Sequence, residues 1–187
     1  MADSVKHERI VLTYEDYLTL PNDGKRYEIL EGELVVTPSP VIMHQTVSQN
    51  LEFILLSYLK EHRCGIFFHA PVDVILSGIT VVVPDMLYVS NERASIVSDR
   101  GIEGAPDLIA EILSPSTARY DRLSKMQLYA KHGIQWYWIL DHSEKTLEVY
   151  GNSGGFYELT KKYSGGETLD SPLFPGLSIK LDQVWGQ

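Results

Sequence analysis

Residues 107–113 (DLIAEIL) form an almost continuous apolar run, which constrains the fold of the 187-residue chain more than any other feature. Such runs are typical of strands that are buried on both faces, at the centre of a sheet. A Ser-Pro-Ser sequence at 114–116 ends the strand, a helix is predicted from about residue 118 to residue 132, and residues 136–140 form another buried strand. Strand, helix and strand in this order predict a crossover unit, in which the two strands are parallel.

The rest of the chain predicts further strands and one long helix around that unit. A Thr-x-x-Asp pattern beginning at Thr13 is typical of a helix N-terminus, and apolar residues recur at helical spacing over 42–61. The expected elements are a short helix over 13–20, a hairpin of strands 26–30 and 33–37, a long helix over 42–61, β-rich runs over 65–70, 72–76 and 80–89, and strands over 146–150 and 156–159. Residues 90–105 are polar, so we expect a loop or an irregular crossover there.

Together these elements predict a mixed α/β fold of the α+β-like kind. We expect a single mixed sheet that is flanked by helices, with antiparallel hairpins in the N-terminal part. A chain of this length normally forms one domain. We therefore predict a single domain over residues 1–187, with residues 1–9 as a candidate disordered segment.

Composition excludes several classes of protein. The net charge of −9 and the pI of about 5.1 count against a protein that binds nucleic acid by electrostatics alone. They count less against a metal-dependent enzyme, because the cation offsets clustered carboxylates. The single cysteine, Cys64, excludes an intramolecular disulfide and a multi-cysteine zinc site. No uncharged apolar run approaches the roughly 18 residues that span a bilayer, and residues 1–9 are unlike a signal peptide, so we expect a cytoplasmic protein without a membrane partner.

Two carboxylates interrupt apolar strands, and they are the strongest candidates for a functional site. Asp85 lies within residues 81–89 (VVVPDMLYV), and Glu111 lies within residues 108–113 (LIAEIL). Burying a carboxylate is costly unless it pairs with a cation or binds a metal. For either acid alone, the alternative is a salt bridge to arginine or lysine, or a position at the exposed end of a strand.

A second Pro-Asp pair, at residues 106–107, offers Asp107 as a competing partner for Glu111. These two acids share one strand, and four residues at about 3.3 Å each place them roughly 13 Å apart. One ion with oxygen ligands at about 2.1–2.5 Å cannot bridge that gap. Asp85 comes from a different strand and can converge with Glu111, whereas we expect Asp107 to cap the entrance of the strand.

The sequence also resembles the PD-(D/E)xK phosphodiesterase superfamily, whose members have restriction-endonuclease-like folds. The resemblance rests on Pro84-Asp85, followed after 25 residues by Glu111-Ile112-Leu113. More narrowly, residues 106–117 (PDLIAEILSPST) resemble the signature of the Uma family of nucleases. Further matches occur, in order, at residues 27–34 (YEILEGEL), Pro38, His44, Asp121, Arg122, Lys125, 128–130 (LYA), Gly133, 137–138 (YW) and 172–177 (PLFPGL). The similarity covers roughly residues 10 to 185 and implies a restriction-endonuclease-like domain.

One departure from the superfamily pattern concerns the lysine that normally follows the glutamate by two residues, on the same strand face. Leu113 occupies that position here. The Uma pattern also lacks this lysine and has one on the next helix, which corresponds to Lys125. The resemblance further implies that Glu31 and His44 adjoin the metal centre. From residue type alone, Glu31 would be a solvated turn residue and His44 a capping or exposed residue.

The resemblance implies metal-assisted hydrolysis of phosphodiester bonds. Asp85, Glu111 and the backbone carbonyl of Ile112 would hold Mg²⁺ or Mn²⁺, which oxygen ligands favour over zinc. Lys125 would stabilise the negative charge that develops during hydrolysis, and Glu31 and His44 would complete the rim of the site.

A basic turn follows the strand that carries Glu111. Arg119 and Arg122 either contact a phosphate backbone together with Lys125, or pair with Asp121 and other surface acids. Positions 122, 125 and 129 are expected to share one face of the helix.

The expected function is therefore that of an endonuclease acting on nucleic acid, with DNA as the expected substrate. We expect self-association into a homodimer, because cutting both strands requires two sites. Two alternatives stay open. One is a catalytically inactive, nuclease-like module that binds a protein or nucleic-acid partner, which Leu113 and the net charge of −9 support. The other is hydrolysis of a different phosphate ester.

Overall fold

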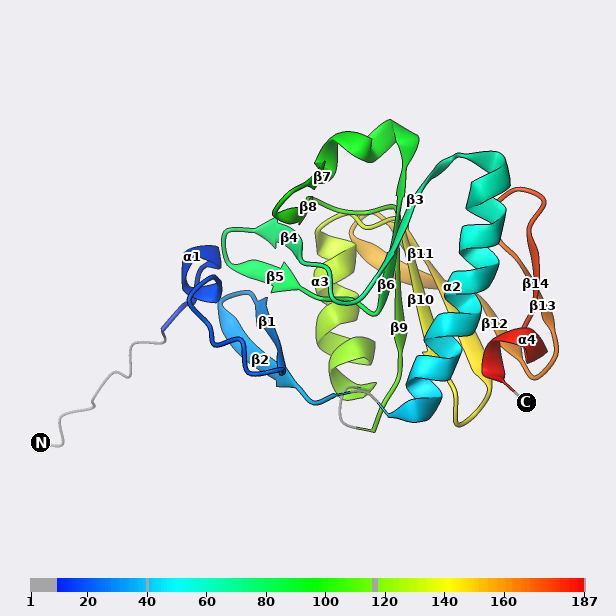
Figure 1. The fold of residues 1–187 in the computed structure, drawn as a ribbon, viewed down its shortest axis with the longest axis horizontal. Coiled ribbons are helices and arrows are strands. Elements are labelled where there is room, and N and C mark those ends of the chain that lie inside the picture. Colours follow the sequence, from blue (N-terminus) through cyan, green and yellow to red (C-terminus); the bar gives the residue numbers. More distant parts are fainter. Residues whose placement is uncertain (1–9, 40, 116–117, 187) are drawn as a thin grey trace, which may run out of the picture.

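Within residues 10–39, 41–115 and 118–186, the computed structural model contains two six-stranded β-sheets and one two-stranded sheet (Figure 1). The predicted disorder of residues 1–9 lies outside these described residues. The elements are α1 (Tyr14–Tyr17), β1 (Arg26–Leu30), β2 (Glu33–Thr37), α2 (Ile42–His62), β3 (Gly65–His69), β4 (Val74–Ser77), β5 (Thr80–Val82), β6 (Met86–Ser90), η1 (Asn91–Ile96), β7 (Val97–Ser98), β8 (Gly101–Glu103), β9 (Leu108–Ile112), η2 (Tyr120–Lys125), α3 (Met126–Lys131), β10 (Trp136–Asp141), β11 (Thr146–Ser153), β12 (Phe156–Ser164), β13 (Thr168–Asp170), β14 (Ser178–Lys180) and α4 (Asp182–Trp185).

The predicted buried strand, β9, lies inside the central sheet, which has the order β12-β11-β10-β9-β6-β3. It runs parallel to β10 on one side, where Glu111 is opposite Ile139, and antiparallel to β6 on the other, where Ala110 is opposite Met86. Every residue of β9 is buried. The parallel crossover between β9 and β10 and the mixed character of the sheet are therefore confirmed.

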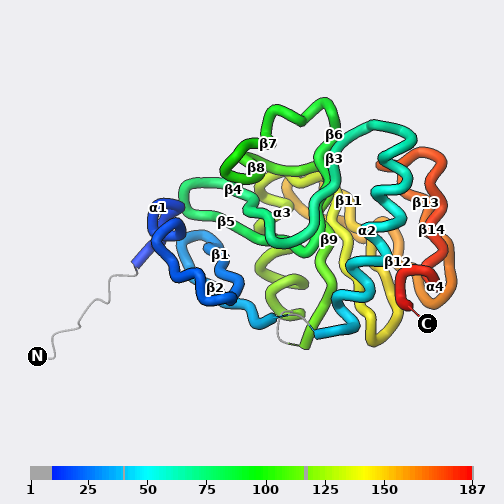
Figure 2. The backbone as a smooth tube through the Cα atoms, viewed as in Figure 1, coloured from blue at the N-terminus to red at the C-terminus, as the bar shows by residue number. Residues whose placement is uncertain are grey.

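Different elements cover the two faces of the central sheet (Figure 2). One face packs against α2 and the C-terminal segment, in a core that includes Leu51, Trp138 and Phe174. The other face packs against α3 and the second sheet, in a core that includes Tyr129 and Val82. Residues of β9 alternate between the two cores, so Glu111 points to the same side as its neighbours Ile109 and Leu113.

The second sheet has the order β2-β1-β5-β4-β8-β7 and corrects the prediction of a single sheet. The run 80–89, predicted as one β-rich element, is two strands, because β5 belongs to the second sheet and β6 to the central one. Pro84 lies between them and has no N–H to donate to a ladder. Asp85 consequently lies where the chain passes from one sheet to the other.

The helical predictions are confirmed with changes at their ends. The capping box of α1 forms between Thr13 and Asp16, although the helix ends at Tyr17. The helix predicted over 118–132 contains a π-helical segment, η2, before α3. Among the described residues, no helix is long and apolar enough to cross a membrane.

A pair of substitutions in α2 tests the packing of this helix on the central sheet. Leu55 is fully buried, whereas Phe53 is 73% exposed on the same helix. We expect Leu55→Ala to lower the free energy of unfolding by about 2–5 kcal/mol, because it removes buried methyl groups and leaves a cavity. Phe53→Ala should change it by less than about 0.5 kcal/mol. Urea denaturation of both variants measures this difference, and equal losses would contradict the packing described.

Candidate functional site

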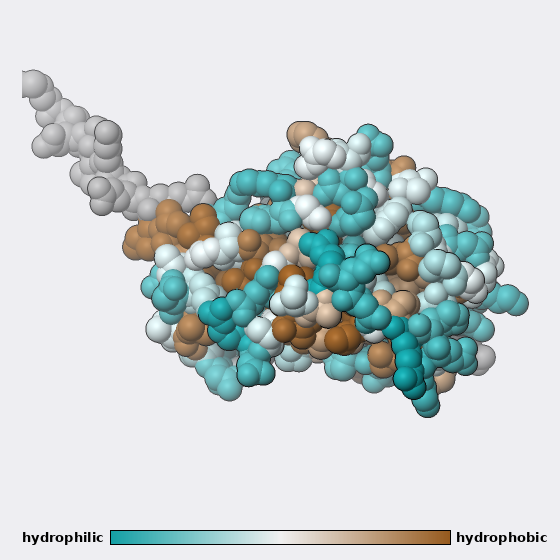
Figure 3. All heavy atoms as spheres, turned by 90° about the horizontal axis from the view of Figure 1, so that it is seen from above, coloured by the Kyte–Doolittle hydropathy of each residue, from teal (hydrophilic) through white to brown (hydrophobic). Residues whose placement is uncertain are grey.

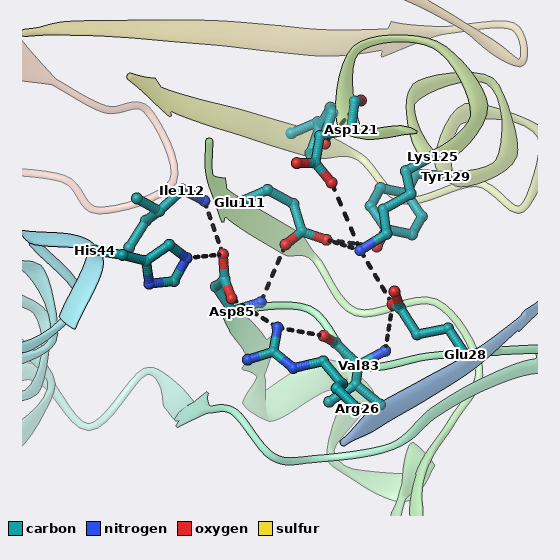
Figure 4. Close-up of polar contacts among 11 residues, drawn as sticks. Arg26, Glu28, His44, Val83, Asp85, Glu111, Ile112, Asp121, Lys125 and Tyr129 are labelled. Carbon is teal, nitrogen blue, oxygen red and sulfur yellow. Dashed lines mark hydrogen bonds and ion pairs between the residues drawn. The ribbon is translucent and has the colours of Figure 1, made fainter. Parts of the chain in front are cut away.

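Asp85 and Glu111 lie side by side, as the spacing argument predicts (Figure 4). Asp85 directly precedes β6, and Glu111 lies in the neighbouring strand β9. The backbone N–H of Asp85 donates to Glu111 Oε2 at 3.2 Å, and the N–H of Ile112 donates to Asp85 Oδ2 at 2.9 Å. The two side chains are buried, so the pairing of β6 with β9 fixes two carboxylates next to each other in the interior.

Two basic side chains, one from β1 and one from α2, contact the Asp85 carboxylate. Arg26 Nη1 of β1 lies 2.9 Å from Asp85 Oδ1, and His44 Nε2 of α2 lies 2.9 Å from Asp85 Oδ2. Burial raises the pKa of Asp85, but His44 and Arg26 lower it by more, so its pKa lies well below the usual range. The sequence-predicted His44 is therefore brought to Asp85, and Asp85 is held as a carboxylate.

Lys125 contacts Glu111 at Oε1, the oxygen that does not accept the N–H of Asp85. It also contacts acids of β1 and η2. Its Nζ lies 3.0 Å from Glu111 Oε1, 3.0 Å from Glu28 Oε1 of β1 and 3.6 Å from Asp121 Oδ1 of η2. The hydroxyl of Tyr129 also donates to Glu111 Oε1, at 2.8 Å. An ammonium group thus reaches Glu111 from the facing helix, at the position that the resemblance predicts for it.

Burial and the crowding of acids set the protonation of this cluster. Burial raises the pKa of Glu111, as do Asp85, Asp121 and Glu28, while Lys125 lowers it, and the net pKa is about 8. Burial lowers the pKa of Lys125, but the surrounding carboxylates raise it by more, so its pKa lies above the ordinary value. The raised pKa keeps a proton on Glu111 near neutral pH, and a further cation beside it would favour its ionised form.

The π-helical geometry of η2 decides which residues of this segment face the cluster. A π-helix has i→i+5 hydrogen bonds and therefore a wider turn than an α-helix. Asp121 and Lys125 are buried in the cluster, whereas Arg122 lies 2.6 Å from Glu148 Oε2 of β11. The prediction that positions 122, 125 and 129 share one face is wrong, because Asp121 takes the place expected for Arg122. Arg119 is exposed.

The structure does not bring Glu31 into the cluster. Glu31 occupies the turn between β1 and β2 with a φ of 49°, and its side chain pairs with Lys131. The acid of this hairpin that contacts Lys125 is instead Glu28, which is 1% exposed and also accepts the N–H of Val83 at 2.9 Å. Position along the hairpin explains the difference, because Glu28 lies within β1 whereas Glu31 lies in the turn beyond its end.

Sequence reasoning missed four members of the cluster, each of which has a signal in the sequence. Glu28 is a charged residue within a strand, the criterion that selected Asp85. Asp121 and Tyr129 lie four residues on either side of Lys125, a spacing that places side chains together on a helix. Arg26 lies two residues before Glu28, so the two side chains share one face of β1.

Other acids and aromatics of the sequence lie away from this cluster. Asp107 accepts the N–H of Ser90 at 2.7 Å at the entrance of β9, which is the capping position expected for it. Asp73 accepts the hydroxyl of Tyr17 at 2.7 Å. Trp138 is fully buried in the core.

A pocket of about 200 Å³ gives access to the carboxylates. Its walls include Asp85, Glu111, Lys125, Arg26 and His44. Among the described residues, no three His, Cys, Asp or Glu side chains are grouped so that they alone could hold a metal ion. Mg²⁺ is commonly held by only one or two carboxylates, with water in the remaining positions. Asp85 and Glu111 supply the two carboxyl groups that such an ion needs.

Comparison with known proteins places the chain among nuclease-like proteins. The Uma2 family, described as "Putative restriction endonuclease", matches residues 14–182. A crystal structure described as "a putative nuclease belonging to DUF820", from Anabaena variabilis ATCC 29413, superimposes with a TM-score of 0.78 at 23% identity, over 93% of this chain and 97% of that one. The chain has the same restriction-endonuclease-like fold.

Two uncharacterized proteins of Synechocystis sp. (strain PCC 6803) are also similar in sequence. One is 23% identical over 93% of this chain and 91% of its own length. The other is 24% identical over 77% of this chain and 82% of its own length.

Glu148 gives a pH prediction at the edge of this region. Burial raises its pKa, but Arg122, Lys162 and Tyr150 lower it by more, so its pKa lies below 4.5 in the folded protein. A lowered pKa contributes stability above the unfolded pKa, and this contribution is lost as the pH falls through the folded pKa. The difference in unfolding free energy between the parent and Glu148→Gln should therefore be constant above about pH 5 and shrink below about pH 4.5.

Urea denaturation of both proteins across this pH range measures the difference. A difference that does not change with pH would mean that Glu148 is not held as a carboxylate by Arg122 and Lys162.

Proposed function

This chain belongs to the Uma2 family, and we propose on that basis that it hydrolyses phosphodiester bonds of nucleic acid with a divalent metal ion. The observation that supports this proposal most is the position of Lys125. Its Nζ lies 3.0 Å from Glu111, although it comes from a helix and not from the strand. The site therefore keeps two carboxylates and an ammonium group together, which argues against an inactive module.

The residues that would hold the ion are Asp85, Glu111 and the backbone of Ile112. In an extended strand, the N–H and C=O of one residue point to the same neighbouring strand. Because the N–H of Ile112 donates to Asp85, its carbonyl is directed to the same edge of β9. This set consists of oxygen donors, which suit Mg²⁺ or Mn²⁺. A bound ion of this kind polarises a phosphoryl oxygen and makes water more acidic.

The protein's own side chains would prepare and complete that chemistry. Arg26 and His44 keep Asp85 ionised and fix its orientation. The hydroxyl of Tyr129 fixes Glu111 Oε1. The Lys125 ammonium lies at the same pocket and can offset negative charge on a phosphate during hydrolysis. His44 Nδ1 is buried and has no hydrogen-bond partner among the described residues, so it is suited to orient a water molecule.

DNA is the proposed substrate, and Arg119 is the proposed contact to its backbone. Arg119 is exposed at the start of η2, the segment that also carries Lys125. Arg122 is held by Glu148, so a role in phosphate binding would require it to leave that ion pair. We also propose that the protein acts as a homodimer and in the cytoplasm.

A matched pair of glutamate substitutions tests the site. We expect Glu111→Gln to lower the rate of Mn²⁺-dependent cleavage of DNA by at least about 10²-fold, because it removes one charged oxygen donor and leaves the shape of the side chain. Glu158→Gln, on the exposed face of β12, should cleave at the parental rate. Gel assays on single-stranded, duplex and structured DNA measure both variants beside the parent.

The outcomes separate the remaining alternatives. Absence of cleavage by the parent with Mg²⁺ or Mn²⁺ on every DNA and RNA substrate would contradict the nuclease proposal and favour a binding module. Cleavage that Glu111→Gln leaves unchanged would place the reaction at another site.

A further inference from the structure

A second, larger pocket lies next to the carboxylates. It has a volume of about 610 Å³, which is within the range of small-molecule sites. Arg26, Thr37 and Pro38 line both this pocket and the smaller one over Asp85 and Glu111. The two pockets therefore lie next to each other, and a ligand that extends past these shared residues would reach both.

The lining of this pocket combines flat apolar groups with hydrogen-bonding side chains. Tyr17 and Tyr27 contribute aromatic rings. Leu18, which is 63% exposed, also lines it, and Figure 3 shows apolar side chains grouped among hydrophilic ones on the face seen from above. The carboxylate of Asp73 and the amide of Asn22 supply polar groups. Such a lining suits a planar heteroaromatic ring with amino groups on its edge.

Basic side chains line both pockets, as a ligand with phosphate groups requires. Arg26 and Lys125 line the smaller pocket, where a phosphate would meet the proposed metal ion. The larger pocket is lined by Lys25 and Arg26 as well as by Asp73. The Asp73 carboxylate can accept hydrogen bonds from exocyclic amines, and Lys25 can meet a neighbouring phosphate of the strand. A phosphate at the carboxylates and its base in the larger pocket would satisfy both.

We propose that the larger pocket binds the base of an unpaired nucleotide next to the scissile phosphate, so that the enzyme selects single-stranded or bulged DNA. This inference rests on the proposed function. A base in a duplex is stacked and paired, and it can enter a protein pocket only after it leaves the helix. The net charge of −9 agrees with this mode, because recognition through a pocket needs less of the basic surface that attracts a duplex.

Binding measurements test this inference separately from cleavage. Fluorescence anisotropy in Ca²⁺, which also takes oxygen ligands, compares three labelled probes of equal length: a single strand, a strand of abasic units and a perfect duplex. We expect the parent to bind the single strand at least about tenfold more tightly than either of the others, because only it offers an unpaired base for stacking.

Paired variants identify the pocket. The double variant Tyr17→Ala with Tyr27→Ala removes both rings, so the ratio of its affinities for the base-bearing and the abasic strand should fall close to one. The double variant Tyr17→Phe with Tyr27→Phe keeps both rings and should retain the parental ratio. Phe156→Ala removes an aromatic ring that is 77% exposed on β12, and it should have no effect. Circular dichroism establishes that each variant is folded.

Cleavage of the same probes in Mn²⁺ is measured in parallel. Equal binding of all three probes by the parent, or no binding, would overturn the base pocket whether or not DNA is cleaved. A preference that survives loss of both rings in a folded variant would also overturn it. Base-dependent binding without any cleavage would uphold the pocket and contradict the proposed hydrolysis.

Discussion

The ammonium group of Lys125 lies in the interior of the protein, where its charge depends on the carboxylates around it. Glu28 belongs to the second sheet and Glu111 to the central sheet, so the ammonium connects η2 to both. Removing one partner from a buried ionic group typically costs about 3–5 kcal/mol, because the remaining charge is left uncompensated. The arrangement that would support catalysis is therefore also part of what holds the two sheets together.

The break at Pro84 has a similar double role. A continuous strand over 80–89 would pair Asp85 in one sheet, but the change of sheet at this point brings its carboxylate to Glu111 and lets its N–H donate to the same residue. Glu28 accepts the N–H of Val83 beside the break. The irregular backbone between β5 and β6 is thus satisfied by an acid of the site, which links the path of the chain to the position of the candidate metal ligands.

Much of this could be predicted from the sequence, because it follows from local patterns. The buried strand β9, the crossover to β10 and the approach of Asp85 to Glu111 depend on apolar runs and on strand spacing. The second sheet could not be predicted, because the sequence of a single strand does not specify which distant strand it pairs with. The sequence does not predict the position of Arg122, because nothing in the residues of η2 indicates a π-helix. Glu28 meets the same criterion as Asp85, a charged residue within a strand, whereas the resemblance points to the turn residue Glu31 as the acid of the site.

The central claim is that Asp85 and Glu111 together hold a divalent metal ion. Anomalous diffraction from a crystal soaked in Mn²⁺ tests it most directly, because the signal marks the ion itself and does not depend on activity. The account predicts a peak within about 2.1–2.5 Å of carboxylate oxygens of both residues. A peak elsewhere in the molecule, or none at a Mn²⁺ concentration that supports cleavage, would contradict it.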